Sequence, residues 1–299
     1  MVSVPVVKPP EKPAPTTKLS WTAMAWFGGL LILCYAPILY RLVSEWTHNQ
    51  DMGYGFFVPI VAAYIAWRRR HVLLAAPRQS NGWGLVIVIY AACEALAATI
   101  GAELFTQRLA FVIALFGVVL YLGGTRWVKI LLFPLLLLLF MIPIPEIIYA
   151  TLTLKLQMIA SSLGEMLITA VGIPVFRTGN VLHLPSQNLD VAEACSGIRS
   201  LLALGFLSLV YAYFADRRVW MRWALLIATI PIAIVANGIR VAFSGVLSQV
   251  NTKYAQGAYH ELEGYIVFIV ALIALLITHR VLRAIAAKGG GVQTKMENA

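Results

Sequence analysis

The chain has 299 residues, of which 60% are hydrophobic and only 12% are charged, whereas soluble domains carry about 25% charged residues. This composition excludes a water-soluble fold, because no such fold could bury that much apolar side-chain surface. The formal net charge is +10, but the basic residues gather in short clusters between apolar runs, as in cytoplasmic loops of membrane proteins, so nucleic acid is not an expected partner.

The first 20 residues are rich in proline and lysine and contain no apolar stretch followed by a small-residue cleavage site. We therefore expect residues 1–20 to form a disordered cytoplasmic tail, with the first membrane helix acting as an uncleaved anchor. Residues 21–284 are expected to form one transmembrane domain, and residues 285–299 a second cytoplasmic tail.

A helix needs about 20 apolar residues to cross the hydrocarbon core of a membrane. Runs of this kind occur near residues 21–40, 53–67, 82–101, 108–124, 127–143, 196–214, 223–242 and 264–282. They predict an all-α fold, a polytopic transmembrane helical bundle with about eight crossings.

A further helical stretch, residues 146–172, is of a different kind because its polar residues recur every four positions. These residues are Thr153, Gln157, Ser161, Glu165 and Thr169. The spacing puts a polar stripe along one face of an amphipathic helix. Such a helix could cross the membrane with its stripe against other helices, or it could lie in the interface or re-enter it.

The distribution of lysine and arginine favours one of these alternatives, because short cytoplasmic loops carry an excess of both. If 146–172 makes no net crossing, all the basic clusters fall on the side of the N-terminus. This reading places both termini in the cytoplasm and puts the active site on the extracytoplasmic face of the cell's inner membrane. The outer segments are then residues 41–52, 102–107, 144–195 and 243–263.

Three cysteines make an odd count, which excludes a full disulfide framework. Cys34 and Cys93 lie in apolar runs and are expected to be small buried hydrophobic residues. Cys195 is expected in the first turn of a helix, where unpaired N–H groups and the helix dipole favour a thiolate, with Arg199 on the same helical face. The alternative is that Cys195 is an interfacial hydrophobe and Arg199 a lipid-facing anchor.

Two further polar insertions lie near outer helix ends. Arg240 and Asn237 share one face of an otherwise apolar helix, and an arginine at membrane depth usually faces a partner or a wet cavity. His260 precedes the last crossing, and histidine is the usual general acid or base near neutral pH. With Cys195 on the same side, these residues would supply the parts of acyl transfer. No metal-ligand spacing or cofactor motif is present, so neither a metal nor a cofactor is expected.

The segment EACSGIRS around Cys195, the segment NGIR that ends at Arg240, and His260 together resemble the exosortase/archaeosortase family. The resemblance runs from about residue 45 to 282 and extends to GIPV, GNV and the segment DMGYGFFVPIVAAYIAWRRR. Many members of that family have a His-Gly pair where this chain has Tyr54-Gly55.

The resemblance implies a membrane-embedded cysteine protease or transpeptidase with Cys195, Arg240 and His260 as catalytic residues. Its partners would be exported proteins that end in a sorting signal, namely a Pro-Glu-Pro-like motif, a membrane helix and a basic tail, together with membrane lipids. Arg199 and Asn237 are expected to bind this substrate. The alternatives are a small-solute transporter or channel with Arg240 in its pathway, and a non-catalytic assembly factor for exported polysaccharide.

Overall fold

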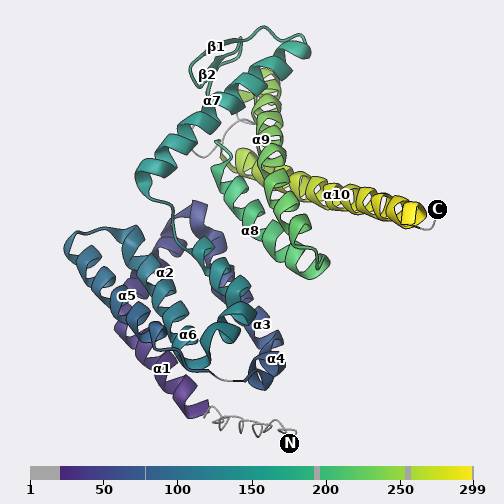
Figure 1. Cartoon of the computed structure of the whole chain (residues 1–299). Helices are drawn as coiled ribbons and strands as arrows, with labels where there is room; N and C mark the ends of the chain where they lie inside the picture. The colour runs from purple at the N-terminus through teal and green to yellow at the C-terminus, as the bar shows by residue number, and fades with distance from the viewer. Residues whose placement is uncertain (1–20, 78, 192–195, 253–256, 298–299) are drawn as a thin grey trace, which may run out of the picture. The chain divides into compact units, whose positions relative to one another are not determined.

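The computed structural model describes residues 21–77, 79–191, 196–252 and 257–297 (Figure 1). It is 83% helical, which confirms the predicted all-α polytopic fold. Within the described residues, six helices are long and apolar enough to cross a membrane, or up to seven if the helix pair Trp26–Cys34 and Ala36–His48, bent by 70°, forms one span. The predicted number of about eight crossings therefore stays a prediction.

The chain divides into two compact units, each described here by itself. The first comprises Met1–Ser44 and Ala62–Ile142, and the second comprises Glu45–Val61 and Pro143–Ala299. The helices of the first unit are α1 (Trp21–Cys34), most of α2 (Ala36–His48), α4 (Arg70–Ala75), α5 (Trp83–Ile100), α6 (Leu104–Leu137) and the 3-10 helix η2 (Leu138–Met141). Helix α3 (Phe57–Arg68) begins in the second unit and continues into the first.

The first unit differs from the predicted crossings in three places. The runs 108–124 and 127–143 fall largely in the single helix α6, whose two helical segments join at Gly124 with a φ of 71°. The run 53–67 forms a helix of only 12 residues, α3. Cys34 and Cys93 are exposed rather than buried, because in a membrane helix an apolar residue can face lipid as well as protein.

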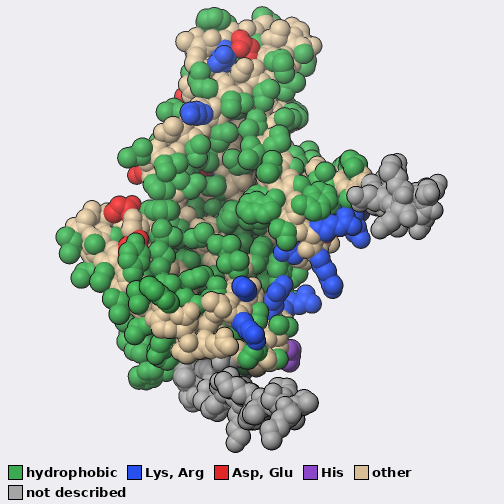
Figure 2. Space-filling view, in the orientation of Figure 1, with side chains coloured by type: hydrophobic (Ala, Val, Ile, Leu, Met, Phe, Trp, Pro, Cys, Tyr) green, Lys and Arg blue, Asp and Glu red, His purple; other side chains and the backbone are tan. Residues whose placement is uncertain are grey.

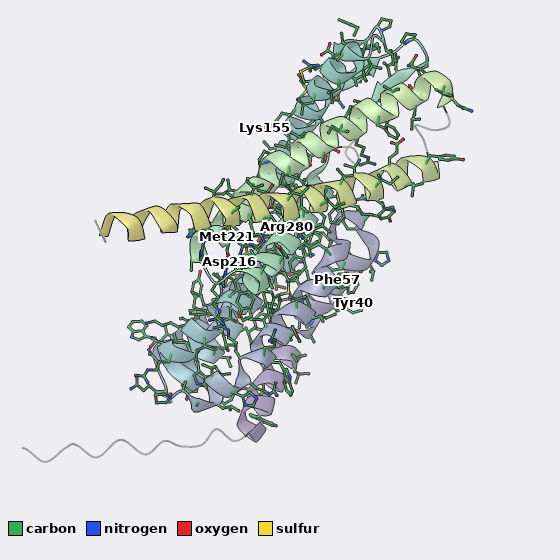
Figure 3. All side chains as sticks on the ribbon, turned by 90° about the vertical axis from the view of Figure 1, so that its right-hand side faces the viewer. Tyr40, Phe57, Lys155, Asp216, Met221 and Arg280 are labelled. Carbon is green, nitrogen blue, oxygen red and sulfur yellow. The ribbon has the colours of Figure 1, made fainter. Side chains whose placement is uncertain are left out.

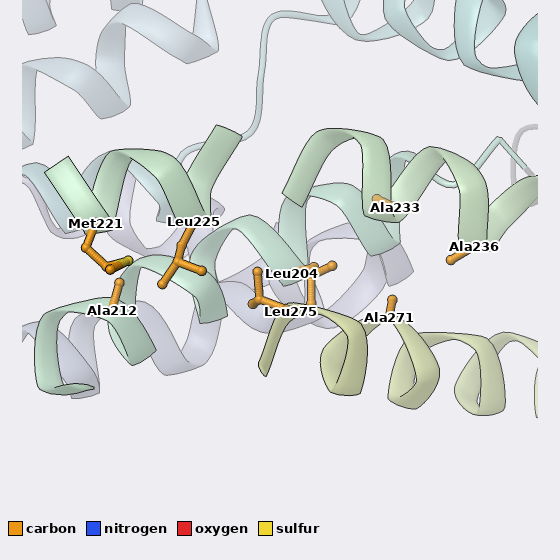
Figure 4. Packing of buried hydrophobic residues seen from close by; sticks show 8 residues of the cluster. All are labelled: Leu204, Ala212, Met221, Leu225, Ala233, Ala236, Ala271 and Leu275. Carbon is orange, nitrogen blue, oxygen red and sulfur yellow. The ribbon is translucent and has the colours of Figure 1, made fainter. Parts of the chain in front are cut away.

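The second unit is built around the long helix α9 (Val219–Val250). It packs against α7 (Glu146–Ala170), α8 (Ile198–Ala215) and α10 (Gly257–Glu297). Small and aliphatic side chains from α8, α9 and α10 fill the core between these three helices, as Figure 4 shows for Leu204, Ala212, Met221, Leu225, Ala233, Ala236, Ala271 and Leu275. Because α8 and α9 are joined by a short turn, this core fixes an α-helical hairpin against α10.

Helix α7 packs on α9 through small residues that let the two backbones approach closely. A Cβ atom added at Gly164 would lie 2.7 Å from a methyl group of Val241, and one added at Gly245 would lie 2.6 Å from the side chain of Ile168. Small residues of this kind are typical of helix contacts in membranes. Of the predicted polar stripe, Thr153, Gln157 and Ser161 are buried, so its first three residues face the protein.

A small antiparallel sheet, which was not predicted, follows α7. Its strands are β1 (Phe176–Thr178), β2 (Val181–His183) and β3 (Asn188–Asp190), in the order β1-β2-β3. The buried residues Leu182, Leu184 and Val191 pack against Ile168 of α7 and Val241 of α9. The sheet is thus held by its apolar residues on the same helix pair.

Large apolar side chains are exposed along most helices, and Figure 2 shows hydrophobic side chains over much of the visible surface. Exposed apolar patches larger than a few hundred Å² are rare in soluble monomers. The exposed residues of α10 illustrate the pattern, since Ile266, Ile269, Val270, Ile273 and Ile277 are each at least half exposed. This surface agrees with a helical bundle that lies in lipid.

Candidate active site

Cys195 lies outside the described residues, but the chain resumes directly after it at Ser196. Ser196 is buried, and its hydroxyl oxygen accepts a hydrogen bond of 3.3 Å from the N–H of Ile198. Helix α8 begins at Ile198, because Gly197 has a φ of 81°, which is not a right-handed helical value. The prediction that Cys195 lies in the first helical turn, on one face with Arg199, falls on a residue outside the described part of the chain and stays a prediction.

Gly197 meets the second motif at Asn237 of α9. A Cβ atom added at Gly197 would lie 2.7 Å from Cγ of Asn237, so only glycine fits both the positive φ and this close approach. Asn237 is itself only 4% exposed. Gly197 follows Cys195 by two residues, and Asn237 precedes Arg240 by three. The contact therefore holds the chain just after Cys195 against α9 close to Arg240.

Arg240 belongs to α9, and its side chain faces the first turns of α10. Its guanidinium carbon would be 3.4 Å from a Cβ atom added at Gly264, and the side chain is half-buried. His260 lies one helical turn before Gly264 in α10, although its side chain is outside the described part. The structure therefore brings the backbone at His260 and the side chain of Arg240 to one region of the unit.

The packing of α9 on α10 at Arg240 and Gly264, called the α9–α10 seam below, continues one turn further along α9 with a buried polar contact. The hydroxyl of Ser244 donates a hydrogen bond to the carboxylate of Glu263, and both residues are at most 5% exposed. Because Glu263 directly precedes Gly264, the carboxylate and the guanidinium of Arg240 enter from facing helices at neighbouring positions. Buried charges in proteins are normally paired or hydrogen-bonded, so this seam fixes the register of α10 on α9.

Arg199 is held by a segment from the N-terminal part of the chain, the 3-10 helix η1 (Gln50–Phe56). Its Nε donates a hydrogen bond of 2.7 Å to the Asp51 carboxylate, and its Nη2 donates one of 3.3 Å to the side-chain oxygen of Gln50. The hydroxyl of Tyr149 in α7 donates to the other carboxylate oxygen of Asp51. The ion pair is partly exposed, with 43% of the Arg199 side chain accessible, so its contribution to stability is small.

Aromatic contacts also hold η1 in place within the second unit. Tyr54 stacks on Phe206 of α8 with the ring centroids 6.0 Å apart, and Trp46 meets Phe56 edge to face at 5.2 Å. Tyr54 thus stands beside α8. Through Asp51 and Tyr54 the segment contacts the first three turns of α8.

Several of these residues were not identified as site residues from the sequence. Gln50 and Asp51 lie in the predicted outer segment 41–52 and Glu263 in the predicted outer segment 243–263, and none of the three has a role in the predicted site. A signal was present in both cases, because Asp51 stands in an otherwise glycine- and aromatic-rich segment and Glu263 at the start of an apolar run. Within the described residues no group of three potential metal ligands occurs.

The comparisons with known proteins agree with the motifs. The family model of the transmembrane exosortase matches residues 46–277, which is most of the chain. No curated protein and no solved structure gives a significant match. Because the matched range includes the EACSGIRS and NGIR segments and His260, as well as η1, the chain belongs to the transmembrane exosortase family.

Proposed function

We propose that this membrane exosortase is a cysteine protease or transpeptidase that cleaves the C-terminal sorting signal of exported proteins, with Cys195 as its nucleophile. The observation that carries the proposal is the contact of Gly197 with Asn237, together with that of Arg240 with Gly264. These two contacts bring three separate segments to one end of the α8–α9–α10 bundle. Each segment contributes a residue type that acyl transfer uses.

In the proposed reaction, the Cys195 thiolate attacks a peptide carbonyl of the substrate and forms a C–S bond. The tetrahedral intermediate then breaks its C–N bond, and the leaving amine takes up a proton as the helix-and-tail fragment departs. An amine, a hydroxyl group or water next attacks the thioester, the C–S bond breaks, and the thiol is restored. No oxidant, reductant or cofactor is required at either step.

Arg240 is the proposed electrostatic partner of this reaction. Its half-buried guanidinium would stabilise the oxyanion or the thiolate, and removal of one such donor lowers rates by about 10²–10³-fold in acyl-transfer enzymes. His260 is proposed to deprotonate the thiol and to protonate the leaving amine. The buried Asn237 supports the backbone that carries the nucleophile, which adds a positioning role to its proposed contact with substrate.

Arg199 keeps its proposed role in substrate binding. A guanidinium group has five N–H donors, and the described bonds to Asp51 and Gln50 use two of them. With 43% of its side chain accessible, Arg199 can still present donors to a carboxylate of the substrate. Asp51 would then hold the Arg199 guanidinium in one orientation during substrate binding and release.

The charge distribution of the second unit supports an extracytoplasmic site. The Tyr211 hydroxyl lies 2.7 Å from Nδ1 of His279, whose Nε2 is 3.9 Å from the Asp216 carboxylate, so the later part of α10 lies at the α8–α9 turn. Figure 3 shows Asp216 and Met221 at this turn close to Arg280. This end carries the basic residues Arg217, Arg218, Arg222, Arg280 and Arg283. By the positive-inside rule it is cytoplasmic, and the end with Gly197 and Arg240 is outside.

The experiment is cleavage of a reporter protein that carries a C-terminal sorting signal, followed in cells by gel mobility and by mass spectrometry of the new C-terminus. Cys195→Ala is expected to abolish cleavage at an unchanged protein level. Cys93→Ala is the matched control, because it removes a free thiol from an exposed helix position of the first unit. Continued processing by Cys195→Ala would overturn the proposal and leave the transporter and assembly-factor hypotheses.

A further inference from the structure

One edge of the small sheet is open. Strand β3 is the outer strand and pairs with β2 alone in the sheet. At the other edge, β1 contacts α7, and Arg177 of β1 bonds Glu165 of that helix at 3.0 Å and the carbonyl of Gly179 at 2.9 Å. The residues of β1 and β3 are exposed to a similar extent, but β1 is tied to α7 by this side-chain ion pair.

The register shows which backbone groups of β3 point away from β2. The N–H of Leu184 donates to the carbonyl of Gln187 at 3.1 Å, and the N–H of Val191 donates to the carbonyl of Asn180 at 3.1 Å. In an antiparallel ladder, hydrogen-bonded pairs alternate with pairs whose polar groups face outward. Gln187 and Val191 are therefore hydrogen-bonded positions, and so is Leu189 between them. The backbone N–H and C=O groups of the two alternate residues point away from β2.

Those residues are Asn188 and Asp190, each opposite a β2 residue in the register. Their N–H and C=O groups form an unpaired row, and among the described hydrogen bonds none engages these backbone groups. Their side chains are exposed and bonded within the sheet, with Asn188 Oδ1 2.9 Å from the His183 ring and Asp190 Oδ1 2.9 Å from the Asn180 amide. An unpaired row of this kind is a template for one more strand.

The open edge leads directly to the proposed nucleophile. Asp190 precedes Cys195 by five residues, a stretch that spans at most about 18 Å when fully extended. Val191, directly after β3, is buried in the cluster that includes Val241 of α9, and Gly197 lies against Asn237 of the same helix. A chain lying along β3 would therefore pass within a few residues of Cys195.

We propose that β3 binds the substrate polypeptide next to its scissile bond as a fourth strand, through the backbone groups of Asn188 and Asp190. This inference rests on the proposed function and adds the mode of recognition. An extended peptide is the occupant that fits, because it presents N–H and C=O groups at the same two-residue interval. Recognition of this kind reads the backbone, so it tolerates exported proteins that differ in side chains beside the cleavage site.

The first test compares Asn188→Pro with Asn188→Ala in the full-length protein. Proline removes the outward N–H and adds bulk on the open edge without removing a bond to β2, and alanine leaves the backbone intact. Because both variants lose the Asn188 side chain and only proline loses the N–H, we expect kcat/KM for the reporter to be about fivefold or more lower in Asn188→Pro than in Asn188→Ala, the loss of one net hydrogen bond. Equal values in the two variants would overturn the inference. Labelling of Cys195 by a small maleimide should be unchanged in both, which shows that the nucleophile is intact.

The second test leaves the enzyme unaltered and modifies a synthetic peptide that contains the sorting segment of a processed protein. One N-methyl group is placed at successive residues before the scissile bond. Strand pairing predicts that cleavage is lost at every second position and retained between them. Equal tolerance at all positions, with cleavage still dependent on Cys195, would overturn this inference alone, whereas cleavage without Cys195 would overturn the proposed function. A change of oligomeric state in Asn188→Pro with normal cleavage would assign the edge to a second copy of the chain and would also overturn the inference.

Discussion

Replacing Gly197 by alanine is expected to lower both stability and activity. Part of the loss comes from overlap with Asn237, and this part can be measured separately from backbone strain. Alanine at a φ of 81° adopts the left-handed region, at a cost of about 1–2 kcal/mol. Its Cβ atom would also lie 2.7 Å from Cγ of Asn237, and overpacking of a buried site costs about 1–3 kcal/mol. Gly172→Ala is the matched control, because Gly172 has a φ of 86° and a Cβ atom there would meet nothing within 4 Å.

The two variants are compared by thermal unfolding in detergent and by cleavage of the reporter. Gly172→Ala should show only the backbone term, so Gly197→Ala should be less stable by a further ~1–3 kcal/mol. The added Cβ atom also pushes the Cys195 segment away from α9, so we expect kcat/KM to fall at least about tenfold in Gly197→Ala alone. Adding Asn237→Gly to Gly197→Ala should recover part of the stability lost through overlap of the Ala Cβ atom with Asn237. Equal losses of stability in the two single variants would refute the reasoning.

Three further changes test neighbouring parts of the structure. Asp51→Asn removes the charge that holds Arg199, and cleavage should fall several-fold. Because the pair is partly exposed, the free energy of unfolding should fall by less than about 1 kcal/mol, and a large loss of stability would contradict this interpretation. Gly264→Leu should displace the guanidinium of Arg240 and lower kcat by about 10²-fold or more with the fold retained, measured by cleavage and size-exclusion chromatography. The pKa of Glu103 is lowered by hydrogen bonds from the side chain and N–H of Thr106 and from the N–H of Phe105. The ionised Glu103 therefore stabilises α6 above the ordinary pKa of a carboxyl group, and this stabilisation is lost as the pH falls through the lowered value. The difference in unfolding temperature between the parent and Glu103→Gln should therefore shrink below about pH 4, and a difference independent of pH would contradict the assignment.

Periodicity and charge were sufficient to predict the class of fold, because a membrane leaves few backbone solutions. They did not predict where helices join. The runs around Gly124 are separated by Thr125 and Arg126 in the sequence, yet the backbone passes through a positive φ with no intervening loop. Nor did they predict the sheet, since each of its strands has three residues, too few for an alternating pattern to stand out.

The site was predictable as a set of motifs but not as a set of contacts. Cys195, Arg240 and His260 were identified from local sequence and from their expected side of the membrane. The partners of Arg199 lie 148 and 149 residues away in the chain, and no local pattern indicates a pairing at that separation. Gly197 and Asn237, which lie so close that a Cβ atom added at Gly197 would overlap Asn237, are likewise 40 residues apart in the chain.

The position of α7 can be argued from the lengths of the helices beside it. Helix α8 has 18 residues and spans about 27 Å, close to the thickness of the hydrocarbon core. Gly197, the residue before the start of α8, lies beside Asn237 of α9. Leu163, Gly164 and Ile168 of α7 contact α9 at Gly238, Val241 and Gly245, which all follow Asn237 in the chain. The C-terminal half of α7 therefore packs on the part of α9 that continues past the start of α8, and the small sheet packs on the same part at Val241. By length and composition α7 is itself one of the six helices that can cross a membrane, so the expectation that 146–172 makes no net crossing stays a prediction.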